Sequence, residues 1–337
     1  MILNPTVIAN LLASLSVSLL VVPAAAVGVR ILQAWNLQSG SELQLALERR
    51  TYLVSTVLSY ACGLQLLSLF LYVFTANALH ALFVGAMCAA GTLYVNPFGY
   101  PTLLLKIVNF TLAGLWLLLN HADEQAPDYP LIRAKYAFLV MLTPFVLTET
   151  VLLGAYFLGM RPDVITSCCG RLFSTEATGG LAGALAALPT APMVWGFYGT
   201  MALTLAGGVY AYRVGRGSYL YTVLAVVAFL VSLVSIITFI SVYIYEMPTH
   251  HCPFCLLMRE YGHVGYVLYF ALFGGLLSGS GIGVLTPFRN VSSLQSVIPP
   301  LVRKLTLTSV ILYAAFTVIV SYRIAASELT LWGGPTP

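Results

Sequence analysis

Charged side chains are scarce in this chain of 337 residues. Only 8% of the residues are Asp, Glu, Lys or Arg, whereas 59% are hydrophobic, and the mean hydropathy is +0.92. Because about a quarter of the residues in a soluble globular domain are charged, this scarcity excludes a soluble domain. The composition predicts a polytopic integral membrane protein whose main partner is the lipid bilayer.

Runs of Lys or Arg are also lacking, and the net charge of +4 is spread over several connectors. This excludes nucleic-acid binding and a polybasic lipid patch. The segment from Met1 to Pro5 has no basic residue ahead of the first apolar run and no obvious small-residue cleavage site. We therefore expect a retained first helix instead of a signal peptide. Since no connector is long enough for a second domain, residues 1–337 are expected to form a single integral membrane domain.

Long apolar runs are abundant, and a bilayer core requires about 20 apolar residues per helix. The sequence thus predicts an all-α membrane bundle of about nine transmembrane helices. A turn at residues 96–101 separates the third and fourth runs, and it is either a loop or a re-entrant kink. The expected spans run roughly over residues 6–27, 52–76, 80–97, 102–120, 136–159, 194–213, 219–245, 264–283 and 305–324.

Cysteine is scarce as well, because six residues are too few for a disulfide scaffold of this length. Cys62 and Cys88 lie inside apolar runs and are interpreted as inert small hydrophobes. The others lie in connectors, as the adjacent pair Cys168-Cys169 and within His250-His251-Cys252-Pro253-Phe254-Cys255. Two thiols at the Cys-x-x-Cys spacing can form a disulfide or hold one soft metal ion, and the imidazoles can activate a thiol or add ligands.

The two cysteine-bearing connectors are predicted to lie on the same membrane face, because two spans, residues 194–213 and 219–245, separate them. With nine spans, Lys and Arg are divided evenly between the two faces, so charge bias gives no orientation. Thiol pairs at a membrane surface most often serve an oxidising compartment. We therefore expect these loops on the extracytoplasmic side of a bacterial inner (plasma) membrane.

A thiol–disulfide oxidoreductase is the first hypothesis. Cys252 would attack as the thiolate, Cys255 would resolve the mixed disulfide, and Cys168 and Cys169 would exchange electrons with them and with a thioredoxin-like partner. These two pairs resemble those of the quinone-linked disulfide-generating membrane oxidoreductases and the vitamin K epoxide reductase family. The resemblance would imply quinone as an acceptor, but it covers only these cysteines, and those families are smaller helical bundles.

Two alternatives use the same residues differently. His250, His251, Cys252 and Cys255 can bind copper or zinc, because thiolate and imidazole select such ions, and the chain would then transfer or insert a soft metal. In the other alternative, the chain is a non-catalytic subunit of a larger membrane complex, and its disulfides are structural. Bound haem is not expected, since nothing in the histidine spacing indicates two facing axial ligands.

Two ionisable residues lie inside expected spans, Glu149 in the fifth and Lys106 in the fourth. Charges at membrane depth are costly, so they are functional candidates. The two helices are antiparallel neighbours in sequence, which makes a Lys106–Glu149 pair feasible. The pair is either a structural contact or, together with His263, part of a path that carries protons to or from the thiol site.

Overall fold

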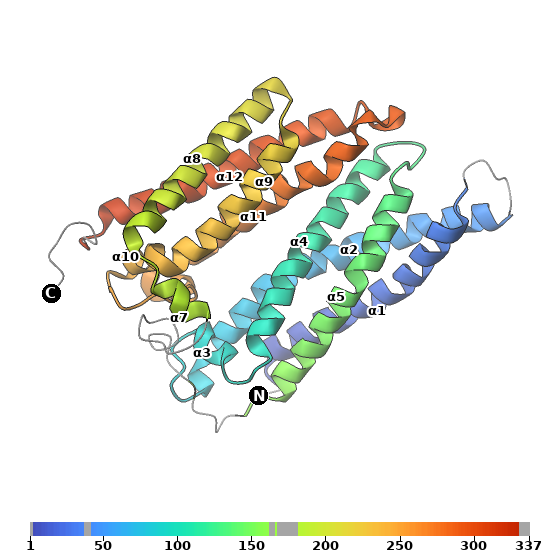
Figure 1. Cartoon of the computed structure of the whole chain (residues 1–337). Coiled ribbons are helices and arrows are strands. Elements are labelled where there is room, and N and C mark those ends of the chain that lie inside the picture. Colours follow the sequence, from blue (N-terminus) through green and yellow to red (C-terminus); the bar gives the residue numbers. More distant parts are fainter. Residues whose placement is uncertain (1–2, 37–41, 162–165, 167–180, 330–337) are drawn as a thin grey trace. The chain divides into compact units, whose positions relative to one another are not determined.

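The computed structural model describes residues 3–36, 42–161, 166 and 181–329. In this part of the chain the regular elements are helices, and none is a strand. The backbone contacts divide the chain into two compact units. Unit 1 contains Met1–Thr75, Leu93–Pro162 and Pro287–Leu301, and unit 2 contains Ala76–Thr92, Asp163–Thr286 and Val302–Pro337. Figure 1 labels their helices.

Unit 1 is built on four long helices: α1 (Pro5–Ala34), α2 (Glu42–Ala78, in this unit up to Thr75), α4 (Gly99–Glu124) and α5 (Ile132–Leu158). The side chain of Asn4 accepts a hydrogen bond from the backbone N–H of Thr6, which satisfies one of the unpaired donors at the start of α1. Helix α5 packs against both α1 and α4. The buried core of the unit gathers around Trp116 and Tyr136.

Unit 2 contains α8 (Thr190–Val214), α9 (Ser218–Ser235), α10 (Ser241–Tyr245), α11 (Val264–Leu285) and most of α12 (Ile298–Ala326). A π-helical segment, Ile236–Ile240, joins α9 to α10. Short elements fill the connectors: 3₁₀ turns at His80–Leu82, Cys255–Leu257 and Arg259–Tyr261, and helices α3 (Ala89–Leu93) and α7 (Leu181–Ala186).

Small residues let the helices of unit 2 approach closely, as their spacing every four residues along α11 indicates. A Cβ atom on Gly279 would lie 2.4 Å from Cβ of Ala225 on α9. The carbonyl of Gly279 accepts a hydrogen bond from the Thr222 hydroxyl at 3.0 Å, and that of Gly275 accepts one from Ser309 on α12 at 2.9 Å. The glycines therefore serve helix packing.

Seven described helices are long and apolar enough to cross a membrane. They are Pro5–Ala34, Gln44–Leu82, Gly99–Glu124, Ile132–Leu158, Ser218–Tyr245, Val264–Asn290 and Ile298–Ala326. Helix α8 has 25 residues but is not among these seven. The chain thus has the helices of a multi-pass membrane protein, although the expected count of about nine is not reached.

The expected third span, residues 80–97, is wrong. The segment contains only the 3₁₀ turn His80–Leu82 and the five-residue helix Ala89–Leu93. Part of this apolar segment is buried inside the protein, since Cys88, Ala89 and Leu93 are all 0% exposed, whereas Val84 and Met87 are more than 60% exposed. Hydropathy cannot separate burial in protein from burial in lipid, and here it indicated a span where the chain folds into a loop.

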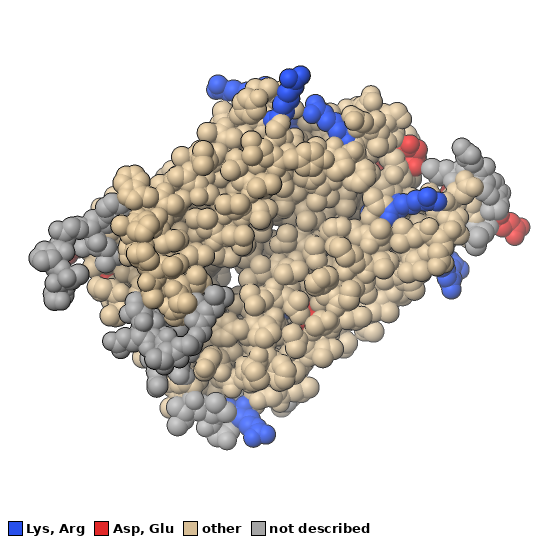
Figure 2. All heavy atoms as spheres, viewed as in Figure 1, with Lys and Arg blue, Asp and Glu red and all other residues tan. Residues whose placement is uncertain are grey.

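The outward faces of the helices are apolar. Leu53 and Tyr60 on α2 and Phe270 on α11 are among the large hydrophobic residues that are more than 60% exposed. Figure 2 shows helix flanks formed almost entirely of uncharged residues, with Lys and Arg gathered near helix ends. This pattern fits helices whose sides are covered by lipid and whose ends reach water.

Candidate thiol and metal site

Three buried thiols converge in unit 2. The sulfur atoms of Cys88, Cys252 and Cys255 all lie within 4.8 Å of one another, and Cys88 Sγ is 3.5 Å from Cys252 Sγ. Their exposed fractions are 0%, 0% and 4%. We call these three residues the thiol cluster. It is the one group of three or more His, Cys, Asp or Glu ligand atoms this close together in the described part of the chain.

Cys88 is held by the short helix that follows it. Its carbonyl accepts hydrogen bonds from the backbone N–H groups of Gly91, at 3.1 Å, and Thr92, at 3.4 Å, which form the first turn of α3. Thr166 fixes the same loop at both ends: its N–H donates to the Val84 carbonyl at 3.0 Å and its hydroxyl donates to the Gly91 carbonyl at 2.8 Å. These bonds hold the Cys88 loop in one conformation.

Gly85 makes the approach of Thr166 possible. It has a φ of +91°, which favours glycine, and a Cβ atom there would lie 2.3 Å from the Thr166 carbonyl oxygen. A larger residue would push the Thr166 backbone away from the Cys88 loop. Two features of the sequence could have indicated a loop here. The apolar run over residues 80–97 contains two glycines, Gly85 and Gly91, and it is slightly shorter than a helix that crosses a bilayer.

Two tyrosines fix the backbone between Cys252 and Cys255. The Tyr245 hydroxyl donates to the Cys252 carbonyl at 2.5 Å, and the Tyr269 hydroxyl donates to the Pro253 carbonyl at 2.7 Å. Cys255 then opens the 3₁₀ turn Cys255–Leu257. Helices α10 and α11, which carry these tyrosines, therefore position both thiols of the motif.

The two histidines beside the motif differ in their surroundings. His251 is 6% exposed, and its Nδ1 lies 2.9 Å from the carbonyl of Ile237 in the π-helical segment. The ring of His250 packs edge-on against Tyr245, with the centroids 4.8 Å apart, and its Nε2 is buried without a hydrogen-bond partner among the described residues. Neither imidazole belongs to the thiol cluster as the described residues define it.

The predicted site residues are thus brought together in part. Cys252 and Cys255 lie side by side, and Cys88, which the sequence analysis set aside as inert, joins them. Cys168 and Cys169 lie outside the described residues. His263 is exposed at the start of α11, where its Nδ1 lies 2.8 Å from the Leu257 carbonyl.

The spacing of the three sulfurs fits one soft metal ion. Three thiolates arranged trigonally at a metal–sulfur distance of about 2.3 Å have their sulfurs about 4.0 Å apart. The observed separations, from 3.5 Å up to at most 4.8 Å, bracket that value. Side-chain rotations that move the sulfurs by less than about 1 Å would therefore complete a three-sulfur site.

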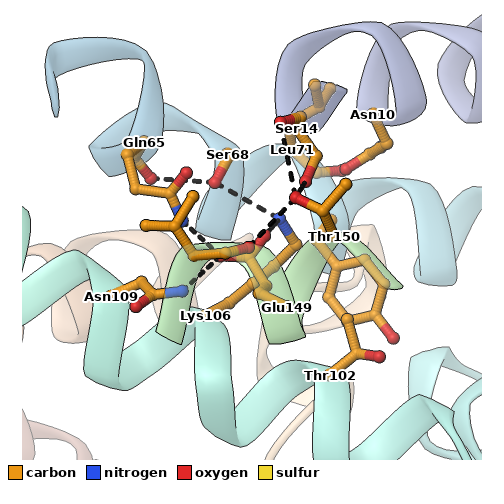
Figure 3. A network of polar contacts seen from close by, with 12 residues as sticks. Asn10, Ser14, Gln65, Ser68, Leu71, Thr102, Lys106, Asn109, Glu149 and Thr150 are labelled. Carbon is orange, nitrogen blue, oxygen red and sulfur yellow. Dashed lines mark hydrogen bonds and ion pairs between the residues drawn. The ribbon is translucent and has the colours of Figure 1, made fainter. Parts of the chain in front are cut away.

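A second polar site lies inside unit 1, as Figure 3 shows. Lys106 Nζ on α4 is 2.7 Å from Glu149 Oε1 on α5, and both side chains are 0% exposed. Asn109 donates to Glu149 Oε2 at 2.7 Å, and Gln65 on α2 donates to the same oxygen. Ser68 accepts a hydrogen bond from Lys106 at 3.3 Å. The expected pairing is present, and three donors stabilise the ionised carboxylate.

A second buried ion pair joins α4 to α5, and sequence reasoning missed it. Lys135 Nζ lies 2.7 Å from Asp123 Oδ2, with exposed fractions of 1% and 0%. Asp123 Oδ1 accepts the backbone N–H of Leu131 at 2.7 Å, and Lys135 donates to Asn120 at 3.0 Å. Helix α4 supplies the cation of one pair and the anion of the other. This reciprocal arrangement indicates a structural role in fixing the register of the two helices.

Comparison with known proteins gives no further guidance, because no protein family, curated protein or solved structure matches the chain.

Proposed function

We propose that this chain is a membrane protein that binds a soft metal ion, copper(I), at the thiol cluster and passes it on. The observation that supports this proposal most strongly is the position of Cys88 beside Cys252 and Cys255. A Cys-x-x-Cys pair alone serves redox and metal chemistry equally well, whereas a third converging thiolate completes a three-coordinate soft-metal site.

Burial favours metal binding over thiol exchange with a protein partner. In thiol–disulfide exchange, the incoming sulfur must approach the attacked sulfur directly. Cys252 and Cys88 are 0% exposed, so a thioredoxin-like protein cannot reach either sulfur in this conformation. A metal ion is far smaller than a protein partner, so it can enter a site that a protein cannot. The apolar surroundings exclude water from the site, so the ion depends on the three sulfurs for its ligands.

We propose a side of the membrane for the thiol cluster from the order of the helices along the chain. We count α8 as a crossing, because its 25 residues extend about 37 Å. With residues 80–97 no longer a crossing, the Cys88 loop and the Cys252 loop share a side with Arg161, Arg259 and Arg323, and Arg171 belongs to the same connector as Arg161. The other side then carries Arg30, Arg49, Arg50, Arg133, Lys135, Arg213, Arg216, Arg289, Arg303 and Lys304.

With this assignment, Lys and Arg are no longer divided evenly between the two faces of the membrane. The rule that Lys and Arg concentrate on the cytoplasmic side then supports an extracytoplasmic position for the thiol cluster. Thiols there are exposed to oxidation unless they are shielded. Burial of all three sulfurs and coordination to a metal ion both protect them, so the orientation agrees with a metal-binding role.

The decisive experiment combines metal analysis and thiol counting on one preparation of the full chain, purified in detergent under reductant and exposed to excess copper(I) before desalting. We expect one copper per chain held by the thiol cluster and lost on Cys252→Ser. The matched control is Cys62→Ser, because Cys62 is also buried but lies on α2 in unit 1 and is not a member of the cluster. Unchanged copper content in Cys252→Ser would contradict the proposal.

A thiol–disulfide exchange function is the second candidate, and the 3.5 Å contact between Cys88 Sγ and Cys252 Sγ supports it. Oxidation would join these sulfurs and release two protons, while the two electrons reduce an acceptor disulfide to two thiols. Cys168 and Cys169, which lie outside the described residues, remain candidates for that acceptor. Under this function, reductant would expose alkylatable thiols while no metal is retained.

A further inference from the structure

We propose that Met247 and His250 form the route by which a soft metal ion enters and leaves the thiol cluster. This inference rests on the proposed function and adds the path to it. Met247 is 45% exposed, His250 is half-buried, and Cys252 is 0% exposed. Thioether, imidazole and thiolate are all ligands that copper(I) accepts, so ligands lie along the chain from the surface to the buried site.

A turn brings the first two ligands together. The backbone N–H of His250 donates to the Met247 carbonyl at 3.1 Å. A turn closed by this bond between residues three apart has Cα atoms less than about 7 Å apart. The two residues are therefore close enough in space to take up one ion in succession.

Tyr245 connects the second ligand to the third. Its ring packs against the His250 ring at 4.8 Å between centroids, and its hydroxyl donates to the Cys252 carbonyl at 2.5 Å. One tyrosine side chain thus spans the gap between the His250 imidazole and the Cys252 backbone.

The state of His250 Nε2 fits this role. It is buried without a hydrogen-bond partner among the described residues, and a buried polar nitrogen without a partner is unfavourable. A transient bond to a metal ion would satisfy it. His251 is different, because its Nδ1 is already engaged by the Ile237 carbonyl. This contact fixes the ring in place and makes His251 a positioning residue of the loop.

A ligand on the route affects rates but not equilibrium. An intermediate site lowers the barrier for entry and exit alike, so its loss should slow both by the same factor and leave the affinity unchanged. A ligand of the final site would instead change the affinity. The inference is therefore separable from the proposed function by kinetics.

The experiment uses the full chain in detergent, loaded with copper(I), and follows transfer to the chromophoric chelator bathocuproine disulfonate by stopped flow. The double variant Met247→Leu/His250→Gln should retain wild-type copper content while uptake and release both slow about tenfold, a change of roughly 1.4 kcal/mol in the barrier. The matched control is Met258→Leu/His263→Gln, which removes the same residue types from the other flank of the motif and should leave both rates unchanged.

The outcomes separate the two claims. Unchanged rates in Met247→Leu/His250→Gln, or equal slowing in the control variant, would overturn the route while leaving copper binding intact. Loss of copper from Met247→Leu/His250→Gln at equilibrium would also overturn it, because the residues would then be permanent ligands. A wild-type chain that binds no copper would overturn the proposed function itself, and the route with it.

Discussion

Cys88 Sγ lies 3.5 Å from Cys252 Sγ although the two residues are 164 positions apart in the chain. The contact joins a loop that follows α2 to the loop that precedes α11, both in unit 2. It converts a two-thiol motif into a cluster of three thiols. The convergence of three sulfurs and their burial, not the Cys88–Cys252 contact alone, are the basis for preferring metal binding to thiol exchange.

Removal of Cys88 should weaken copper binding selectively. Cys88→Ser leaves two sulfurs in the cluster, and we expect the copper(I) affinity to fall by at least about tenfold. Loss of a residue that only supports a metal ligand already lowers metal affinity by about this factor, so loss of a ligand should have at least the same effect. Competition titration with a copper(I) chelator measures the change. An affinity equal to that of Cys62→Ser would show that Cys88 is only a buried small residue.

The buried pair in unit 1 should contribute strongly to stability. Lys106→Met leaves the 0% exposed Glu149 carboxylate without its cation, and we expect a loss of about 3–5 kcal/mol in the free energy of unfolding. Thermal unfolding in detergent measures it. The exposed Lys304→Met should have little effect.

A double variant distinguishes a structural pair from a proton-carrying one. Lys106→Met/Glu149→Leu removes both charges, so most of the lost stability should return. If metal transfer is also unaffected in this variant, the pair is structural. If stability returns but transfer stops, the proton path predicted from the sequence gains support.

Close packing of α9 against α11 gives a prediction for a glycine. A Cβ atom on Gly279 would lie 2.4 Å from Ala225 Cβ, and overpacking of this kind costs about 1–3 kcal/mol. Gly279→Ala should therefore lower the unfolding temperature. Gly199→Ala is the control, because a Cβ atom on Gly199 has no neighbour within 4 Å. Equal behaviour of the two variants would contradict the close approach.

The sequence predicted most of the membrane helices, because lipid-facing helices such as α1 and α11 are apolar all round and hydropathy reports this directly. The prediction failed at residues 80–97, where an apolar run forms only a 3₁₀ turn and a short helix, and where Cys88, Ala89 and Leu93 are buried in protein. It located Cys252 and Cys255 by their spacing and the Lys106–Glu149 pair by its depth. The sequence could not predict the role of Cys88, because no local pattern indicates a contact with a residue 164 positions away.

The proposed orientation is testable with reporter fusions. The C-terminus follows α12 and should lie on the same side as the thiol cluster, whereas Arg216, in the turn between α8 and α9, should lie in the cytoplasm. Alkaline phosphatase should therefore be active when fused after residue 337 and inactive when inserted at residue 216. The reverse pattern would place the thiols in the cytoplasm.

The most direct test of the central claim is X-ray absorption at the copper edge of the copper(I)-loaded chain. We predict three sulfur neighbours at about 2.3 Å, falling to two in Cys88→Ser and remaining three in Cys62→Ser. A spectrum with only nitrogen or oxygen neighbours, or a sulfur count that does not change in Cys88→Ser, would contradict a metal site at Cys88, Cys252 and Cys255.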